Sequence, residues 1–359
     1  MADSKQAPLD AAAAAKAAFA SVQDKPFPND IFTAPELRWA VIGCGVIANQ
    51  MAQSLALAGR KLAGVANRTL TKAQTFADQY GVEKVYDTVE DLYADPDIDA
   101  VYITTPHNTH ITYLRAALAA GKHVLCEKAI TLNSAELDEA RAIAAEHNVV
   151  LMDATTVLHM PLYQELRRRM DAGEFGRMNL AQLNFGSYKE YGDLTNRFYN
   201  RNLAGGAMLD IGVYALSVMR LFMASQPVEV VSLGNTCETG VDVAGGIVCR
   251  NAEQQLGVVS LTLHSKQPKR SVISFDNCYV EVNEYPRADH ATIVWTADGH
   301  REEVAAGTEA YALCYEMADL EQAVAGDDSK RELLDYASDV MKLMTKLRAD
   351  WGVVYPEEE

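Results

Sequence analysis

The stretch WAVIGCGVIANQMAQSLALAG, residues 39–59, decides the fold of the N-terminal half of this chain. The apolar run WAVI leads into Gly43, Gly45 and Ala48, and the residues that follow have helical periodicity. Between a strand and a helix, this G-x-G-x-x-A pattern is typical of a dinucleotide site. The first glycine permits a tight turn, the second lets the backbone approach a pyrophosphate, and the alanine allows close helix packing. The alternative is a structural glycine turn in another α/β protein. The residues expected at the phosphates, where the helix begins, are Gly43, Gly45, Val46 and Ile47.

The rest of residues 36–155 continues this alternation of short apolar runs and helical patterns. Runs such as KLAGVANR, DAVYITTP, KHVLCEKA and VVLMDAT are each separated by a helical pattern. Strands buried on both faces and linked by helices predict a parallel, doubly wound sheet with right-handed crossovers. We therefore expect a Rossmann dinucleotide-binding domain over residues 36–155, preceded by an alanine-rich arm over residues 1–35.

The pattern changes after Thr155. Helical patterns at residues 160–176 and 206–224 precede closely spaced strand-like runs over residues 228–294, and two further helical patterns end the chain. Strand-like runs at short spacing are typical of an antiparallel sheet. The sequence therefore predicts a second, α+β domain over residues 156–350, with a mostly antiparallel sheet.

Composition and charge exclude several classes of partner. The chain has 359 residues with 49 acidic and 32 basic side chains, a formal charge of −17. That charge repels nucleic-acid backbones and anionic membranes, so neither is an expected partner. We find no run of about 20 apolar residues in the sequence, so a membrane span is not expected. Residues 1–30 resemble neither a signal peptide nor a twin-arginine leader. The six cysteines form no C-x-x-C pair, which favours a reducing cytoplasm.

The end of the second predicted strand indicates which cofactor is bound. An NAD site usually offers an acidic side chain there to the ribose 2′-OH. This sequence has Asn67 and Arg68 instead, with Thr69 and Lys72 nearby. Arg68 can hold a 2′-phosphate through charge-assisted hydrogen bonds, so NADP is favoured over NAD. The alternative is that Arg68 merely begins a helix and stacks on adenine.

A polar segment, ITTPHNTH, follows the fourth apolar run at residues 103–110. Ligands of a parallel sheet bind at the carboxyl ends of its strands, so this segment is expected to lie along the cofactor. The alternative is a proline turn and a helix cap. His107 and His110 have H-x-x-H spacing, but with no cysteine or carboxylate nearby they form a poor zinc site, and no metal is expected. The residues of this segment expected at the cofactor are Thr104, Thr105, Pro106, Asn108 and His110.

Two further segments carry candidate catalytic groups. Glu127 and Lys128 directly follow the apolar strand HVLC, and charged side chains at a buried strand end are typical of a functional site. Both are expected at the nicotinamide, unless they are a solvent-exposed pair that opens a loop. In GGAMLDIGVY, Asp210 and Tyr214 lie four residues apart and share one face of a predicted helix. A core tyrosine is the alternative there.

Taken together, VIGCGVIA, AVYITTPHNTH, HVLCEKAIT and GGAMLDIGVY resemble, in order and spacing, the motifs of the glucose–fructose oxidoreductase, inositol dehydrogenase and MocA-like oxidoreductase family. The resemblance covers residues 38–325. It implies a Rossmann domain followed by an α+β domain whose open sheet often mediates oligomerisation, so a homodimer or homotetramer through the C-terminal sheet is expected. It also implies that Lys128 is the motif lysine, Asp210 the helix aspartate and Tyr214 the acid/base residue. With tyrosine at position 214, the sequence resembles the branch of dimeric dihydrodiol dehydrogenases and xylose dehydrogenases, which commonly prefers NADP.

Two positions depart from the family pattern. Ala129 follows Lys128 where the family has proline. If the lysine–proline bond of the family is cis, keeping it cis before alanine costs roughly 3 kcal/mol, so a trans peptide with a displaced Lys128 is the alternative to a cis bond here. The second departure lies in DATTVLHMP, residues 153–161, where the family often has an aromatic or basic residue. That segment therefore does not indicate which sugar is bound.

These features predict an NAD(P)-dependent oxidoreductase that acts on a sugar, a cyclic polyol or a trans-dihydrodiol. Tyr214 is the expected acid or base, and Lys128 is expected to favour its phenolate form, because a pKa of about 10 is too high for neutral pH. Asp210 is expected to bind the substrate or to orient Lys128. Two alternatives remain: an NAD-dependent glycosidase on the same scaffold, and a non-enzymatic NAD(P)-binding regulator, which has no need of these three residues. The side chains expected around the substrate are Tyr188, Tyr191, Arg197, Tyr199 and Arg201.

Overall fold

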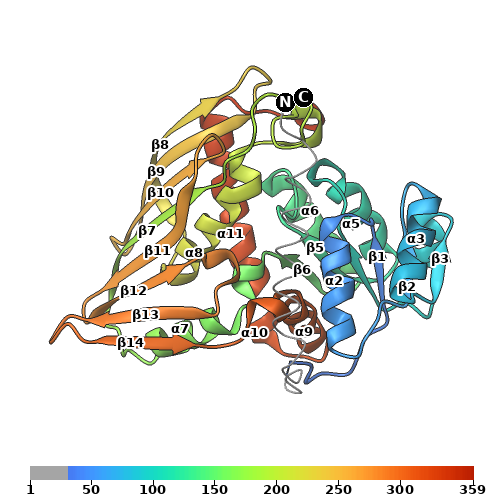
Figure 1. Cartoon of the computed structure of the whole chain (residues 1–359), viewed down its shortest axis with the longest axis horizontal. Helices are drawn as coiled ribbons and strands as arrows, with labels where there is room; N and C mark the ends of the chain where they lie inside the picture. Colours follow the sequence, from blue (N-terminus) through green and yellow to red (C-terminus); the bar gives the residue numbers. More distant parts are fainter. Residues whose placement is uncertain (1–30) are drawn as a thin grey trace, which may run out of the picture.

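The computed structural model describes residues 31–359 of the chain. Two β-sheets lie side by side in this part of the protein, with helices between and around them (Figure 1). Of the predicted N-terminal arm, residues 1–30 lie outside the described residues, and residues 31–35 lead directly into the first strand.

The first sheet, sheet A, has six strands within residues 31–359, in the order β3-β2-β1-β4-β5-β6. All of its strand pairs are parallel, which confirms the predicted doubly wound sheet. The strands are β1 (Trp39–Ile42), β2 (Gly64–Ala66), β3 (Lys84–Tyr86), β4 (Ala100–Ile103), β5 (His123–Glu127) and β6 (Leu151–Ala154). The helices are α2 (Val46–Leu57), α3 (Leu70–Tyr80), α4 (Val89–Ala94), α5 (His110–Ala119) and α6 (Ser134–Glu146). This order places the switch point of the sheet between β1 and β4, where such sheets bind ligands.

Helices cover both faces of sheet A. α2 and α3 pack on one face, and α5 and α6 pack on the other. A helix from the far end of the chain, α9 (Ala312–Val324), joins α2 on the first face. Its Glu321 accepts hydrogen bonds from the Trp39 indole at 3.0 Å and from Arg60 at 2.6 Å. The C-terminal part of the chain therefore returns to complete the core of the first sheet.

The second sheet, sheet B, has eight strands in the described part of the chain, in the order β14-β13-β12-β11-β7-β10-β9-β8. Only β7 and β10 pair in parallel, so the prediction of a mostly antiparallel sheet is confirmed. The strands are β7 (Met178–Gly186), β8 (Pro227–Thr236), β9 (Asp242–Asn251), β10 (Leu256–Thr262), β11 (Gln267–Phe275), β12 (Cys278–Asn283), β13 (His290–Trp295) and β14 (Arg301–Ala305). The other helices are α7 (Pro161–Asp171), α8 (Val213–Phe222), α10 (Asp328–Arg331) and α11 (Leu333–Asp350).

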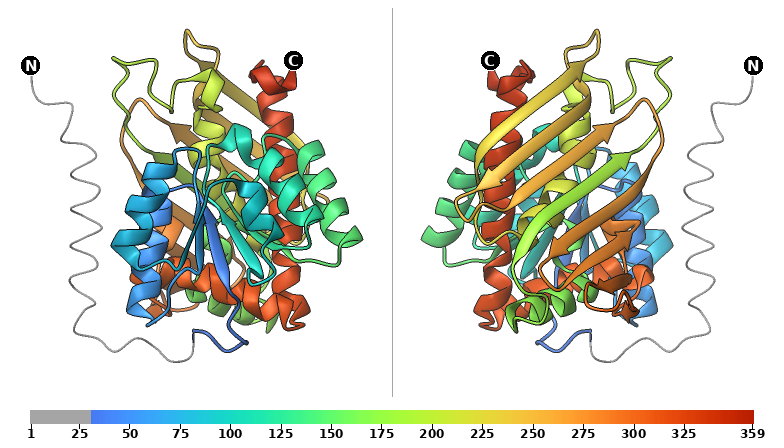
Figure 2. Two further views of the ribbon diagram at one scale, coloured as in Figure 1. Left: turned by 90° about the vertical axis from the view of Figure 1, so that its right-hand side faces the viewer. Right: turned by 90° about the vertical axis from the view of Figure 1, so that its left-hand side faces the viewer.

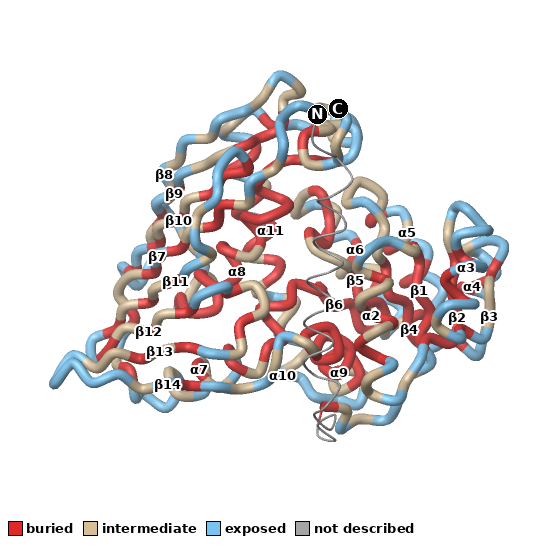
Figure 3. Tube along the Cα trace, in the orientation of Figure 1, coloured by how far each residue is buried: buried red, intermediate tan, exposed pale blue. Residues whose placement is uncertain are grey.

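The inner face of sheet B packs on α8 and α11. α11 also contacts α6 and β6, so it links the second sheet to the first. Buried residues are concentrated in this layer between the two sheets (Figure 3). The outer face of sheet B is open, because no helix of the described residues lies over it (Figure 2, right).

The helical segment Arg201–Phe222 is long and apolar enough, by length and composition, to cross a membrane, with a mean hydropathy of 1.3. This corrects the expectation that the sequence contains no such segment. However, 78 % of its apolar 18-residue stretch is buried inside the protein. Because it packs between sheet B and α11, its apolar composition is that of a core helix.

The helix predicted over residues 206–224 is not uniform. Met208–Gly212 forms a π-helical turn, and α8 follows it directly. The buried carboxylate of Asp242 accepts a hydrogen bond from the Met208 N–H at 2.6 Å. Gly206 precedes this turn with a φ of +127°, and a Cβ there would lie 2.3 Å from the same carboxylate. A glycine is therefore required where Asp242 anchors the start of the helix.

A pair of glycines seats the end of α11 on sheet B. Gly234 of β8 and Gly245 of β9 lie opposite each other in the strand register. The indole of Trp351 covers both, so that a Cβ would lie 2.2 Å from it at Gly234 and 2.4 Å from it at Gly245. The indole N–H also donates to Ser232 at 3.0 Å. Small residues at these two positions are therefore a packing requirement.

We predict that Gly245→Ala destabilises the protein by roughly 1–3 kcal/mol, because the new methyl group overlaps the Trp351 indole. The matched control is Gly246→Ala, since a Cβ at Gly246 meets no described atom within 4 Å. Urea unfolding of both variants tests the prediction. Equal midpoints for the two variants would contradict it.

Candidate active site

The turn between β1 and α2 is built around Gly43. Its φ is +103°, and a Cβ there would lie 2.7 Å from the Thr104 Oγ1 at the end of β4. Its N–H donates to the Ala66 carbonyl oxygen, at the end of β2, at 2.9 Å. Only glycine meets both the left-handed backbone and the close approach. The turn therefore lies against the carboxyl ends of β2 and β4.

The N-terminus of α2 is suited to an anion. Gly45 is the N-cap, and no side chain in residues 31–359 caps the helix there. A Cβ at Gly45 would meet no described atom within 4 Å, and Val46 is 75 % exposed, whereas Ala48 is fully buried against the strand. The first N–H groups of a helix lack intrahelical partners and favour negative charge. The turn formed by Gly45, Val46 and Ile47 therefore fits the pyrophosphate of a dinucleotide.

The end of β2 presents cations and no carboxylate over residues 67–72. The Asn67 side-chain amide donates to the Thr69 carbonyl oxygen at 3.0 Å. Arg68 and Lys72 are exposed at the start of α3. Their positions fit a phosphate on the adenosine ribose, at the place where an acidic residue would otherwise contact the 2′-OH.

The loop of residues 104–110 is ordered by its own side chains. Thr104 Oγ1 donates to the Ile42 carbonyl oxygen at 3.0 Å. Thr109 Oγ1 donates to the Pro106 carbonyl oxygen at 2.7 Å and lies 2.8 Å from Thr105 Oγ1. Pro106 is exposed. The loop thus presents Pro106 and partly buried threonines beside the glycine turn.

His110 is not at the surface of the site, which corrects its expected place at the cofactor. It is fully buried, its Nε2 lies 2.8 Å from the Thr105 carbonyl oxygen, and its Nδ1 lies 3.0 Å from that of Ala129. It joins the loop to the segment after β5. Burial and the neighbouring His110 lower the pKa of His107 to about 3, so its ring is neutral. No group of three or more metal-ligating side chains gathers within residues 31–359.

Three of the predicted residues, Lys128, Asp210 and Tyr214, meet in what we call the Lys128 cluster. Lys128 Nζ donates to the Asp210 backbone carbonyl at 2.7 Å and lies 3.4 Å from its carboxylate. The same ammonium lies 4.7 Å from the centre of the Tyr214 ring. The side chains of Lys128 and Asp210 are 14 % and 11 % exposed. Glu127 instead accepts a hydrogen bond from the hydroxyl of buried Tyr102, behind the cluster.

The peptide bond between Lys128 and Ala129 is cis. The alternative of a trans peptide with a displaced Lys128 is therefore excluded. Ala129 is fully buried, and its carbonyl oxygen lies beside His110.

Burial and charge set the protonation states of the Lys128 cluster. Burial raises the pKa of the Tyr214 phenol above its usual value, and the Lys128 ammonium opposes this shift without reversing it. Burial also disfavours the charged form of Asp210, but Lys128 and then Arg197 outweigh it and hold the pKa of Asp210 at about 2. Burial lowers the pKa of Lys128, and Tyr214 and Asp210 more than offset that effect. At neutral pH the cluster is therefore an ion pair beside a neutral phenol.

Of the five side chains expected around the substrate, Arg197 reaches the Lys128 cluster. Its guanidinium lies 3.5 Å from the Asp210 carboxylate. Tyr199 is fully buried, and its hydroxyl donates to a backbone carbonyl. Arg201 donates to a backbone carbonyl near the C-terminus at 2.7 Å. Tyr188 and Tyr191 are exposed.

The C-terminal residues tie several site segments together. Arg348, only 2 % exposed, donates to Glu358 at 2.8 Å and to the Leu132 carbonyl oxygen, just after the Lys128 segment, at 2.6 Å. Asn108, expected at the cofactor, donates to Glu357 at 2.7 Å and to the Asn202 carbonyl oxygen at 3.2 Å. The amide of Asn108 therefore bridges the two halves of the molecule.

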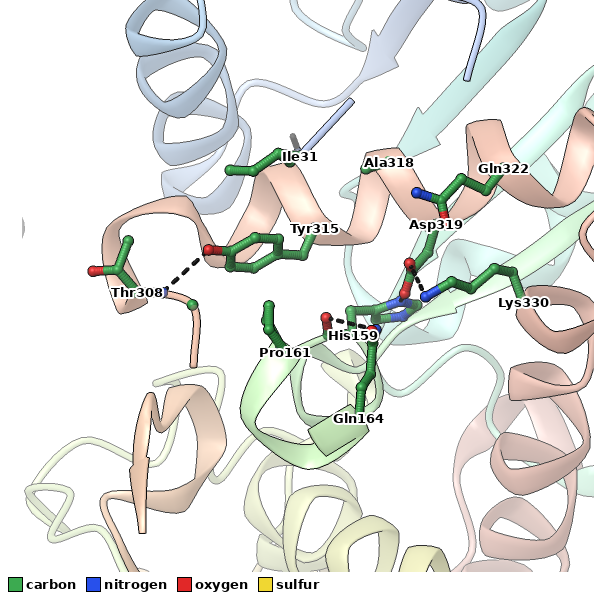
Figure 4. Close-up of a pocket in the computed structure, with 11 residues that line it drawn as sticks. Ile31, His159, Pro161, Gln164, Thr308, Tyr315, Ala318, Asp319, Gln322 and Lys330 are labelled. Atoms are coloured by element: carbon green, nitrogen blue, oxygen red, sulfur yellow. Dashed lines mark hydrogen bonds and ion pairs between the residues drawn. The ribbon is translucent and has the colours of Figure 1, made fainter. Parts of the chain in front are cut away.

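A separate buried network borders a cavity of about 400 Å³ between α7, α9 and α10 (Figure 4). His159 Nδ1 lies 2.9 Å from Asp319, and Lys330 Nζ lies 2.6 Å from the other oxygen of that carboxylate. His159 Nε2 lies 2.8 Å from the Asp153 carbonyl oxygen at the end of β6. This network holds α9 and α10 against sheet A.

Comparison with known proteins shows that the two halves of the chain match the two domains of one protein family. The model of an oxidoreductase family with an NAD-binding Rossmann fold matches residues 37–155, and that of the GFO/IDH/MocA C-terminal domain matches residues 163–281. Both models describe the same family. The chain belongs to the GFO/IDH/MocA oxidoreductase family.

Relatives of this GFO/IDH/MocA oxidoreductase include enzymes of known activity. The trans-1,2-dihydrobenzene-1,2-diol dehydrogenase of Mus musculus is 32 % identical over 244 residues, which cover 66 % of this chain and 72 % of the mouse protein. A 3-ketoreductase from Actinomadura kijaniata in complex with NADP and TDP-benzene has a TM-score of 0.74 and 25 % identity, covering 88 % and 98 % of the two chains. A levoglucosan dehydrogenase in complex with NADH and levoglucosan has a TM-score of 0.76 and 19 % identity, covering 87 % and 97 %.

Sequence analysis missed two residues near the Lys128 cluster of this GFO/IDH/MocA oxidoreductase, Lys189 and Phe198. Lys189 Nζ and the Arg197 guanidinium each lie 4.2 Å from the centre of the Phe198 ring. The mixture of basic and aromatic residues in YKEYGDLTNRFYNR, residues 188–201, was the available signal. Because this segment has no helical or strand periodicity, its spacing did not indicate that Lys189 and Phe198 meet.

We predict that Gly45→Ala leaves the melting temperature unchanged but weakens dinucleotide binding by roughly tenfold or more, about 1.4 kcal/mol. A methyl group there meets no described atom, yet it occupies the space that a pyrophosphate needs. Fluorescence titration and thermal unfolding measure the two effects. A variant that binds NADP⁺ as tightly as the native chain would contradict this assignment.

Proposed function

We propose that this protein is an NADP-preferring dehydrogenase or reductase that transfers hydride between nicotinamide and a carbinol carbon. The substrate is a sugar, a cyclic polyol or a trans-dihydrodiol, and Tyr214 is the acid/base. The observation that carries the proposal is the meeting of Lys128, Asp210 and Tyr214 within one partly buried cluster, after the carboxyl end of β5. The relatives named for dihydrodiol and sugar oxidation support the substrate class.

Each residue of the cluster has a distinct chemical task. When bound, the nicotinamide accepts or donates the hydride. The Tyr214 Oη donates a proton to a carbonyl oxygen in reduction and accepts one from a hydroxyl in oxidation. Lys128 lowers the pKa of the phenol, so it stabilises the phenolate that reduction leaves. Asp210 holds Lys128 in place through its carbonyl oxygen and its carboxylate.

The preference for NADP rests on the residues after β2. Arg68 and Lys72 supply positive charge there, and residues 67–72 include no carboxylate that would repel a 2′-phosphate. Glu127 and Thr104 lie at neighbouring strand ends, so they border the nicotinamide in this proposal. Titration with NADP⁺ and NAD⁺, read by tryptophan fluorescence, measures the preference directly.

The reaction itself is tested by absorbance at 340 nm with NADP⁺ and xylose, glucose or a trans-dihydrodiol. Growth of the signal supports the dehydrogenase and identifies its substrate. Release of free sugar from a glycoside without net NADPH would instead indicate a glycosidase. Tight cofactor binding with neither reaction would indicate a regulator.

We also propose that the outer face of sheet B pairs with a second copy of the chain. Val231 and Leu233 of β8 are 76 % and 83 % exposed, and Val248 of β9, opposite Val231, is 47 % exposed. Apolar side chains gathered on an open sheet face are typical of a protein interface. The symmetric partner is favoured because most soluble oligomers are homo-oligomers.

The pH dependence of the two reaction directions follows from the raised pKa of Tyr214. Oxidation needs the deprotonated oxygen, so its kcat/KM rises with pH up to that pKa. Reduction needs the phenol and is lost as pH rises through the same pKa. Lys128→Met moves both profiles to higher pH, because the ammonium lowers the pKa of the phenol.

Tyr214→Phe is the companion variant. It lowers kcat by roughly 10²–10⁴-fold and removes this ionisation from the pH profile, while cofactor binding persists. Rates measured from acidic to alkaline pH check both variants. A Tyr214→Phe enzyme with the native profile would exclude Tyr214 as the acid/base.

We predict that Leu233→Glu shifts the protein toward the monomer, because a charge among the exposed apolar side chains of β8 and β9 opposes the burial of this face. Leu70→Glu is the matched control, since Leu70 is 45 % exposed on α3, far from β8 (Figure 1). Light scattering coupled to size exclusion gives the mass of each variant. An unchanged oligomer for Leu233→Glu would rule out this face.

A further inference from the structure

On the basis of the proposed function, we infer that the substrate carries an anionic group, a carboxylate or a phosphate, and that Lys189 and Arg197 bind it beside the reacting carbinol. No assignment above gives Lys189 a role. Positive charge is in excess around the Lys128 cluster, the Phe198 ring contacts both cations, and both lie in the half of the fold that does not carry the cofactor residues.

Three cations, Lys128, Arg197 and Lys189, act on the Asp210 carboxylate of the Lys128 cluster. Lys128 and Arg197 both contact the single carboxylate of Asp210, at 3.4 and 3.5 Å. Lys189 adds a third positive charge, and it has no carboxylate within ion-pair distance among residues 31–359. Its neighbour Lys269 is neutralised by Glu284 at 2.7 Å. This local excess of positive charge contrasts with the formal charge of −17 of the whole chain.

The Phe198 ring holds the two cations together. Lys189 Nζ and the Arg197 guanidinium each lie 4.2 Å from the ring centre, so both stay beside the same aromatic side chain. Burial lowers the pKa of Lys189, and the positive charges of Arg197 and Lys128 lower it further against the attraction of Asp210. Like charges gathered at one site repel each other, so an anion that contacts them is stabilised.

The two cations lie on the substrate side of the Lys128 cluster. Lys189 follows β7 and Arg197 precedes the π-helical turn, so both belong to the second half of the fold. The residues that fit the cofactor phosphates, Gly45 and Arg68, lie instead after β1 and β2. Arg197 contacts the same carboxylate as Lys128. An anion bound to Arg197 therefore lies near the substrate carbinol that exchanges a proton with Tyr214.

This geometry favours a compact acid over a neutral diol. A sugar acid such as a uronate or an aldonate has its carboxylate a few bonds from several carbinols, and a sugar phosphate offers the same charge on a longer arm. Arg binds either group through paired N–H donors, and Lys adds a point charge. The mouse relative is named for a diol without charge, so the inference separates this chain from that activity.

The test compares matched charged and neutral sugars on the protein saturated with NADP⁺. Calorimetric titrations with glucose, glucuronate and glucose 6-phosphate give the affinities, and initial rates at 340 nm give kcat/KM. We expect at least one charged sugar to bind tenfold or more tightly than glucose, and the preference to fall with rising salt. Tighter binding of glucuronate identifies a carboxylate, and tighter binding of glucose 6-phosphate identifies a phosphate.

Two variants assign the preference to residues. Lys189→Gln and Arg197→Gln each reduce the affinity for the charged sugar, relative to the affinity for glucose, by roughly tenfold, about 1.4 kcal/mol. Lys269→Gln is the matched control, because that lysine lies over Phe185 and is paired with Glu284. Equal binding of charged and neutral sugars, absence of binding of either charged sugar at millimolar concentration, or variants that keep the preference would each overturn the inference.

The same data separate this inference from the proposed function. A charged sugar that binds through Lys189 and Arg197 without any change at 340 nm supports the anion site and contradicts the dehydrogenase. NADPH formed from a neutral polyol, with no preference for charged sugars, supports the dehydrogenase and contradicts the anion site.

Discussion

The candidate active site depends on one contact between the two halves of the fold, the bond from the Lys128 ammonium to Asp210. Lys128 comes from the end of a strand of sheet A, and Asp210 comes from the π-helical turn that leads into α8. A nearly buried charge without a partner is strongly unfavourable, so each residue requires the other. Their pairing sets the position of Tyr214 against the ammonium, and it brings Arg197 to the same carboxylate.

That contact is possible because other elements hold the two halves in register. α9 returns to sheet A, where Glu321 receives hydrogen bonds from Trp39 and Arg60. The C-terminal residues join the Leu132 carbonyl to Arg348 and Glu358, close to the segment that carries Lys128. Asp242 anchors the first turn of the helix that carries Asp210. Several residues far from the Lys128 cluster therefore determine the distance between Lys128 and Asp210.

Two acidic groups of the site, Asp210 and Tyr214, have opposite protonation states at neutral pH. Burial alone would raise the pKa of both Asp210 and Tyr214, yet the two groups respond differently because Asp210 contacts two cations directly and Tyr214 meets only the ammonium over its ring. The result is an ionised carboxylate beside a neutral phenol. The same cations leave the surroundings of the cluster positive in a strongly acidic protein, a condition that attracts anionic ligands.

The sequence alone determined the parallel sheet, the glycine turn and the family, because strand–helix alternation and short motifs are local properties that periodicity reveals. It also predicted Lys128 from its place at a strand end and Asp210 and Tyr214 from a shared helix face, together with the family motifs, although it did not establish that the three meet. Tertiary structure decided the rest. It buried His110 between two backbone segments, kept the Lys128–Ala129 bond cis, gave Asp210 a π-helical turn and placed Lys189 beside Arg197. These outcomes depend on contacts between residues far apart in the chain, whose free energy exceeds the local preferences that a sequence pattern records.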